Sequence, residues 1–471
     1  MSDGQTPSHG PAVDHGLNRR ILRLAIPSLL ASISVPLIGI ADTVMIGHLE
    51  NVAFLGAVAT ASVVFDVLLW GAGFLRMGTT SIVAQHHGAG DRAECAASLY
   101  RGLIIAALLA VLMFAVCVPI AQFGFGLAGG SSAVQEFAHQ YFEIRILGVP
   151  FVLAIYVCNG FFLGTANAMA PLAVTVVTNI VNVGADYALI FGHWGAPALG
   201  VEGAAWAAVL GNAAGIVVAG ILLFWFYGDV LRTKLQEPLL KAERLRHLFD
   251  TNINLFLRTL CLLYTQFSML AMVSRMGEVP LAAHAVVTQV WSLVSYGIDG
   301  FAHAGEALVG NSLGSGQSKS TRQISRRILA WGAGIGMVFT VIYALGLEQI
   351  AGLFTQHHEV VVAASGLTLV VALMQPLNAL VFVFDGIFIG ANDVEYLFRA
   401  MAVSAFLFFT PAALWLVVWG EGGLLAAWLA YAMMMLGRLV TLSWRYRSDV
   451  WLRSFIKAPP AAVSCTCRRI T

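Results

Sequence analysis

Six acidic residues of this sequence lie inside long apolar stretches, where an ionisable side chain is costly. They are Asp42, Asp66, Asp186, Asp299, Glu306 and Asp385. Acids in such surroundings normally face a water-filled cavity, an oppositely charged partner or a bound ion. The chemistry open to them is the binding and release of a proton, a small cation or a cationic ligand.

Asp186 is the clearest of these candidates because a polar face leads up to it. Asn182 precedes it by four residues and Asn179 by seven, so the three side chains share one side of a helix. Hydrogen bonding between helices would explain Thr175 and Thr178, which continue this face, but that role does not need an ionisable acid. Asp42 lies near the end of an earlier apolar run, where it fits either an ion site or a position at the membrane surface.

A second polar face occurs in the run that contains Asp299 and Glu306. Its members recur every three or four residues and are Gln289, Ser292, Ser295, Asp299, His303 and Glu306. A later run carries Gln375, Asn378 and Asp385 on one side. These residues are candidates for a substrate cleft or a secondary ion site. The alternative for the three acids is ion pairing with arginines of other runs. Those arginines are Arg76, Arg145 and Arg258.

The elements that must position these residues are membrane-spanning helices. Of the 471 residues, 59% are hydrophobic and only 11% are charged, whereas about a quarter of the residues of a soluble domain are charged. A helix needs about 20 apolar residues to cross a bilayer, and twelve continuous runs approach or exceed that length. The first six are 21–46, 53–84, 99–121, 134–162, 172–191 and 201–226, and the last six are 248–273, 281–313, 328–347, 360–389, 397–419 and 424–444. Alternating patterns typical of membrane barrels are not seen.

The two halves of the sequence repeat each other at a constant shift. Segment 147–164 realigns with 373–390, and at the same shift 87–90 realigns with 313–316. We therefore predict an all-α integral membrane protein with two six-helix lobes, a pseudo-two-fold axis along the membrane normal and a cleft between the lobes. The expected organisation is an amino-terminal lobe (1–228), a cytoplasmic linker (229–246), a carboxyl-terminal lobe (247–446) and a cytoplasmic tail (447–471).

Lysine and arginine are sorted between the two sides of the predicted bundle. With the amino terminus in the cytoplasm, Arg92, the basic clusters at 232–246 and 319–327, and the basic tail all lie inside, and Arg275 alone lies outside. This sorting predicts a multi-pass protein of the inner (plasma) membrane with both termini in the cytoplasm. A net charge of +1 without a basic patch argues against nucleic acid as a partner.

Other chemistries lack their signatures. The sequence has no phosphate-binding glycine-rich loop, no metal-spaced cluster of histidine and cysteine, and no nucleophile with a partner base inside the membrane. We therefore expect neither an enzyme nor a cofactor beyond a coupling ion. Cys465 and Cys467 in the tail could bind a metal or be modified, but they lack spaced partner ligands, and we interpret them as reduced.

Several short segments resemble the multidrug and toxic compound extrusion (MATE) family, specifically its DinF-like branch. They are ADTVMIGHL (41–49), LRMGTT (75–80), YFEIR (141–145), NIVNVGAD (179–186), IDGFA (298–302) and FDGIFIG (384–390). Their order and spacing extend the resemblance from residue 20 to residue 444. The resemblance implies export of amphipathic, often cationic organic compounds across the lipid bilayer by cation-coupled antiport. We expect the protein to be a monomer.

Carried over residue by residue, Asp42, Asn182 and Asp186 look like the cation site of the prokaryotic branch. Ala208 stands where the family commonly has a threonine, which removes one possible Na⁺ ligand and favours H⁺ over Na⁺ as the coupling ion. Pro27 matches a proline of the first helix and is a plausible bend point. The alternative function is a lipid or lipid-linked oligosaccharide flippase of the same superfamily, which would be expected to have a strongly cationic cleft.

Overall fold

The computed structural model describes residues 12–49, 52–128, 131–235 and 237–453. Cys465 and Cys467, and most of the predicted tail, lie outside the described residues. The helices of the first half are α1 (Ala12–Gly47), α2 (Val52–Ala72), α3 (Phe74–Gly88), α4 (Arg92–Ala128), α5 (Ser132–Arg145), α6 (Val149–Gly164), α7 (Met169–Phe191) and α8 (Val201–Leu231). Those of the second half are α9 (Ala242–Ser274), α10 (Glu278–Gly314), α11 (Ser318–Phe354), α12 (His358–Ser365), α13 (Thr368–Gly390), α14 (Val394–Val403), α15 (Thr410–Ala413) and α16 (Gly423–Arg447).

These helices confirm the predicted all-α membrane fold. Within the described residues, 11 helical segments from Ala53 onward are long and apolar enough to cross a membrane. Together with α1, whose 36 residues contain the first predicted run, they make the twelve spans in two lobes. Pro27 lies buried inside α1, which is helical on both sides of it, so the bend at this position stays a prediction.

Several spans predicted as single helices are divided. The second consists of α2 and α3, which meet at Gly73. The fourth consists of α5 and α6, joined by one 3₁₀ turn (Ile146–Gly148), with Pro150 in the first turn of α6. The eleventh contains two π-helical stretches on either side of α15, which begins with Thr410 and Pro411. Proline cannot donate to the preceding turn, so a hydropathy pattern alone does not locate such interruptions.

The predicted repeat also holds in the backbone. Gly90 and Gly316, which the repeat makes equivalent, have φ angles of 75° and 74°. Ala166 and Asn392 are equivalent by the same shift, and both have φ 58°, a left-handed conformation that is uncommon outside glycine. Equivalent turns therefore follow equivalent helices in the two halves.

The two halves meet through a pair of matching hydrogen bonds. Gln85 Nε2 of α3 donates to the carbonyl oxygen of Gly390 at 3.1 Å, and Asn311 Nδ2 of α10 donates to the carbonyl oxygen of Gly164 at 2.9 Å. The shift of the internal repeat converts each of these residue pairs into the other. The pseudo-two-fold axis therefore passes between α3 and α10 near their carboxyl ends.

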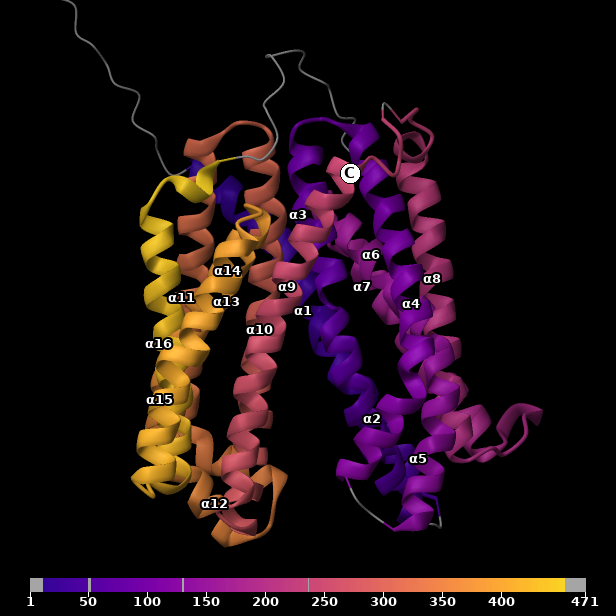
Figure 1. Cartoon of the computed structure of the whole chain (residues 1–471), viewed down its shortest axis with the longest axis vertical. Coiled ribbons are helices and arrows are strands. Elements are labelled where there is room, and N and C mark those ends of the chain that lie inside the picture. The colour runs from indigo at the N-terminus through magenta and orange to yellow at the C-terminus, as the bar shows by residue number, and fades with distance from the viewer. Residues whose placement is uncertain (1–11, 50–51, 129–130, 236, 454–471) are drawn as a thin grey trace, which may run out of the picture.

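We call this end of the molecule the basic end, because the start of α4, the connection from α8 to α9 and the start of α11 carry Arg92, Arg232, Lys234, Lys241 and Lys319. In Figure 1 it is uppermost, and the ribbons of the two halves approach each other there. Toward the opposite end, which carries α5 and α12, the ribbons diverge (Figure 1).

Helix α1 contacts both halves. Ile21, Leu24 and Ala25 belong to the hydrophobic core of the second half, and Gly300 of α10 allows close approach there, since a Cβ at this position would lie 2.5 Å from the carbonyl oxygen of Ala25. Further along α1, the carbonyl oxygen of Ser34 accepts a hydrogen bond from Asn179 of α7 at 3.1 Å. A movement between the two halves must therefore involve α1.

Candidate functional site

The structure brings Asp42, Asn182 and Asp186 together between α1 and α7. Asn182 and Asp186 are 2% and 0% exposed, and Asp42 is half-buried. The carboxyl groups of Asp42 and Asp186 lie close enough to interact directly. The hydrogen-bond partners of Asn182 determine which end of its amide is oxygen and which is nitrogen. In that orientation Asn182 donates to Asp42 Oδ1 at 3.3 Å and accepts from the backbone N–H of Ala208 at 3.2 Å.

Asp186 has unmet hydrogen-bonding capacity. Among the described residues, no donor lies at a normal hydrogen-bond distance and angle from either of its carboxyl oxygens. Two carboxylates side by side repel each other, and burial of an unpaired charge such as that of Asp186 is costly. The pair is therefore suited to sharing a proton or to holding a small cation between carboxylate and amide oxygens.

Close packing of α7 against α8 places Asn182. A Cβ at Gly211 of α8 would lie 2.9 Å from the carbonyl oxygen of Thr178 and 3.0 Å from Cβ of Asn182, so glycine is needed for this approach. The same approach brings Ala208 beside Asn182. Ala208 thus offers a backbone N–H at the site, and its methyl group adds no oxygen ligand.

Arg145 and Tyr141 of α5 are neighbours of this site that the sequence analysis did not assign to it. Arg145 Nη1 donates to Tyr141 Oη and to Ser62 Oγ, both at 2.9 Å, and Nη2 lies 3.9 Å from Asp66 Oδ1. Its positive charge also acts on Asp42. The spacing of four residues between Tyr141 and Arg145 places both on one face of a helix, which was the available signal.

The acids of the second half occupy different surroundings. Glu306 Oε2 forms an ion pair of 3.0 Å with Arg76 Nη1, which joins α10 to α3 across the two halves. Asp385 Oδ2 accepts from Arg258 of α9 and from Arg438 Nη2 of α16, the latter at 2.5 Å. Pairing, the alternative left open for these acids, is therefore what the geometry provides for Glu306 and Asp385.

The other candidates of the second half are dispersed. Asp299 lies within electrostatic reach of Arg76 and Arg258, but no ion pair of Asp299 is found among the described residues. Asn378 is 1% exposed, and neither atom of its amide group has a partner there. Gln289 is exposed. These side chains do not form one cluster comparable to that of Asp42 and Asp186.

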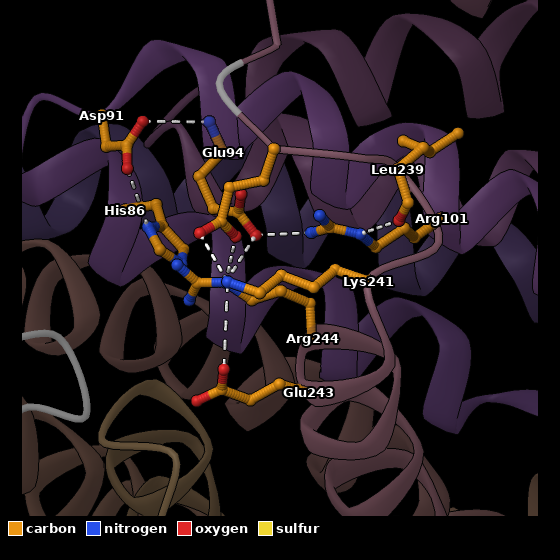
Figure 2. Close-up of polar contacts among 9 residues, drawn as sticks. His86, Asp91, Glu94, Arg101, Leu239, Lys241, Glu243 and Arg244 are labelled. Carbon is orange, nitrogen blue, oxygen red and sulfur yellow. Dashed lines mark hydrogen bonds and ion pairs between the residues drawn. The ribbon is translucent and has the colours of Figure 1, made fainter.

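A separate polar network lies at the basic end, where the connection from α8 to α9 crosses the first half (Figure 2). Glu94 pairs with Arg101, and Arg101 Nε donates to the carbonyl oxygen of Leu239 at 2.7 Å. Arg244 Nε lies 3.8 Å from Glu94 Oε1 and 3.3 Å from Glu237 Oε2. This network fastens the connection to α4.

The network also contains a contact between an imidazole and a carboxyl group. Asp91 Oδ2 lies 3.6 Å from His86 Nδ1, and Figure 2 shows the two side chains facing each other. Hydrogen bonding to His86 lowers the pKa of Asp91 below its ordinary value. The described residues contain no group of three or more histidine, cysteine, aspartate or glutamate side chains that could hold a metal ion.

Comparison with known proteins identifies relatives over nearly the whole chain. The family model MatE matches twice, at residues 27–188 and 255–415. A protein named "DNA damage-inducible protein F" from Escherichia coli (strain K12) is 30% identical over 92% of this chain and 94% of its own length. A "Probable multidrug resistance protein NorM" from Rhizobium meliloti (strain 1021) is 27% identical over 98% of this chain and 97% of its own.

A solved structure shares the fold. It is described as the "Outward-facing conformation of a multidrug resistance MATE family transporter of the MOP superfamily", with a TM-score of 0.81 and 21% identity over 94% of this chain and 98% of that one. The double match of the family model agrees with the internal repeat seen in the backbone.

Proposed function

The chain belongs to the MatE family of membrane transporters and is not an enzyme, and from this premise we propose that it exports amphipathic organic cations in exchange for protons. Relatives named as multidrug resistance proteins support the export of small organic compounds. The coupling ion and the exchange mechanism are argued from the residues of this chain.

The observation that carries the proposal is the pair of facing carboxyl groups of Asp42 and Asp186. Asp186 is fully buried and without a hydrogen-bond partner of ordinary geometry among the described residues. A proton shared by the pair removes the repulsion and restores one donor to the site. Because Asp42 lies on α1, which contacts both halves, the protonation state of the pair is linked to the arrangement of the two halves.

Ala208 supports H⁺ rather than Na⁺ as the coupling ion. It contributes a backbone N–H to Asn182, and an N–H group cannot ligate a cation. Within the described residues the site therefore offers two carboxyl groups and one amide oxygen, and that oxygen already accepts from Ala208. This is a sparse ligand set for Na⁺, whereas one proton needs only two oxygens.

We place the basic end in the cytoplasm and the protein in the inner membrane, because lysine and arginine favour the cytoplasmic side. The halves meet at the basic end through the Gln85 and Asn311 bonds and the Arg76–Glu306 ion pair. With the basic end in the cytoplasm and the halves in contact there, this arrangement would be an outward-facing state. Export would alternate this state with one in which the basic end opens, and Pro27 would supply the flexibility of α1.

The energies suffice for such an exchange. One pH unit across the membrane supplies about 1.4 kcal/mol per proton. A membrane potential of 100 mV supplies about 2.3 kcal/mol per net elementary charge moved, so it adds to the driving force only when more proton charge enters than substrate charge leaves. Each increment of about 1.4 kcal/mol corresponds to a tenfold concentration ratio.

The flippase alternative receives less support. Three of the arginines inside the spans, Arg76, Arg258 and Arg438, are paired with Glu306 or Asp385. They are therefore not arranged as an open cationic site for a diphosphate group.

Transport by the purified protein in liposomes tests the proposal. Uptake of a fluorescent organic cation should follow an imposed pH gradient at clamped membrane potential, and a Na⁺ gradient at equal pH on both sides should not drive it. Transport driven by Na⁺ alone would refute proton coupling. Transport of neither kind, together with movement of a fluorescent lipid between leaflets, would favour the flippase.

A further inference from the structure

Two pairs of polar side chains face each other where α5 packs against α2, toward the end of the molecule opposite the basic end (Figure 1). Ser62 and Asp66 are four residues apart in α2 and share one side of that helix. Tyr141 and Arg145 have the same spacing in α5. Arg145 Nη1 donates to Ser62 Oγ and to Tyr141 Oη, both at 2.9 Å. Two neutral acceptors therefore hold one end of the guanidinium, and they do not neutralise its charge.

The guanidinium of Arg145 is only loosely paired with a carboxyl group. Its Nη2 lies 3.9 Å from Asp66 Oδ1, whereas a hydrogen-bonded ion pair has a distance of about 2.7–2.9 Å. The guanidinium carbon lies over the ring of Phe65, 4.4 Å from the centroid, and a ring face attracts a cation without fixing the direction of its N–H groups. The charge of Arg145 also acts on Asp42. Arg145 therefore stands between Asp66 and the proton-binding pair, and among the described residues it donates a hydrogen bond to neither.

Asp66 is accessible and faces the second half. Its side chain is 68% exposed, although it lies within a span. Its charge reaches Tyr156 of α6 and Tyr296 of α10, so it points toward other helices of the protein, one of which belongs to the second half. An accessible carboxylate in such a position normally faces a water-filled cavity. A ligand that enters between the two halves can therefore reach Asp66.

Charge balance links Asp66 to the proton-binding pair. With one proton shared by Asp42 and Asp186, these two acids, Asp66 and Arg145 together carry a single net negative charge. Loss of the proton adds a second negative charge beside Arg145 and draws the guanidinium toward Asp42. Asp66 then loses its counter-charge, and binding of a monovalent cation there restores the original balance. The other titratable and charged groups of this region are Tyr141, Tyr156 and Tyr296, with Arg76 and Asp299 acting on the last two.

We propose that Arg145 is a positioning residue that couples the proton-binding pair to the substrate, and that Asp66 binds the cationic group of the substrate. While the pair holds its proton, Arg145 stays beside Asp66 and disfavours a second cation there. When the proton leaves, Arg145 turns toward Asp42, and Asp66 becomes available. Proton and substrate therefore exclude each other although they bind to different carboxyl groups. This inference rests on the proposed exchange of protons for organic cations.

Release of protons on substrate binding tests the coupling. A fluorescent organic cation is added to the purified protein in a weakly buffered solution with a pH indicator dye, and bound cation and released protons are measured together. The parent should release about one proton per bound cation, so its affinity should rise about tenfold for each unit of increasing pH. In Arg145→Gln the affinity should change by less than about threefold per pH unit, because Asp66 is available in both states of the pair. Arg145→Lys, which keeps the charge, should restore the coupling, and Ser62→Ala, which removes one hydrogen bond of Arg145 but no charge, should retain it.

A neutral analogue of the same shape separates charge recognition from folding. Asp66→Asn should lower the affinity for the cation about tenfold, as expected for the loss of one charged contact, and should bind the neutral analogue like the parent. Glu143→Gln, a change at an exposed acid of α5, is the matched control and should leave both affinities unchanged. If Arg145→Gln released as many protons per cation as the parent, or if Asp66→Asn bound the cation as tightly, the proposal would be overturned while proton exchange itself stood. A parent that released no protons would overturn both.

Discussion

Adding one methyl group at either of two equivalent glycines should open the basic end. A Cβ at Gly314 would lie 1.9 Å from the carbonyl oxygen of Gln85, and a Cβ at Gly88 would lie 2.0 Å from the carbonyl oxygen of Asn311. Cβ atoms essentially never come within 3.0 Å of such atoms. In each variant the new Cβ would meet a backbone carbonyl oxygen, so no side-chain rotation could relieve the overlap. The helices α3 and α10 must therefore separate in Gly314→Ala or Gly88→Ala.

The size of the effect follows from the nature of the contact. Overpacking by one methyl group costs about 1–3 kcal/mol, and this strain disappears when the basic end opens. A bias of that size changes the ratio of the open to the closed basic end about 5- to 150-fold. Because the two contacts are related by the internal repeat, the two variants should behave alike.

Distances between spin labels at Arg92 and Ser318 measure this ratio. These exposed positions are equivalent in the two halves and lie at the starts of α4 and α11. The fraction of molecules with the short distance between the labels, which marks the closed basic end, should decrease in Gly314→Ala and in Gly88→Ala. Gly352→Ala is the matched control, because its Cβ would meet no atom within 4 Å. If both variants gave the same distances as this control, the assignment of these contacts as the closure of the basic end would be wrong.

Three further outcomes are expected. Asp385→Asn should lower the free energy of unfolding by about 3–5 kcal/mol, because it removes the negative charge that two buried arginines share; a thermal midpoint equal to that of the parent would contradict this. A cysteine at Ser131 should react with an impermeant thiol reagent from outside the cell and one at Ser318 should not, and the reverse pattern would invert the proposed orientation. The lowered pKa of Asp91 means that its contribution to stability is present above its unfolded value of 3.8 and is lost as the pH falls through the folded value. Asp91→Asn should therefore destabilise the protein at pH 7, as measured by chemical denaturation, and an unchanged free energy of unfolding at pH 7 would contradict this.

Hydropathy and the internal repeat were enough to predict the fold, because lipid forces the backbone of each span into a helix. The shift that aligns segment 147–164 with 373–390 also relates Ala166 to Asn392, and these two residues have the same φ angle. The divisions at Gly73 and around Pro411 were not predicted. They depend on local backbone geometry and packing, to which an average of hydropathy is insensitive.

The candidate site was predictable only where spacing within one helix determined it. Asn182 and Asp186 share a face of α7, and resemblance to a family supplied Asp42 on another helix. Arg145 was not assigned to this site, because its position depends on how α5 packs beside α2 and α8.

The most direct test of the central claim is gradient-driven export by the Asp42→Asn and Asp186→Asn variants in liposomes. Asparagine keeps the size of the side chain but cannot release a proton, so both variants should fold and bind substrate at equilibrium, with the pH dependence of binding reduced. Both should lose transport driven by a pH gradient, whereas Asp250→Asn, a change at an exposed acid near the start of α9, should retain it. Parental transport by folded Asp42→Asn and Asp186→Asn would show that protons are exchanged elsewhere.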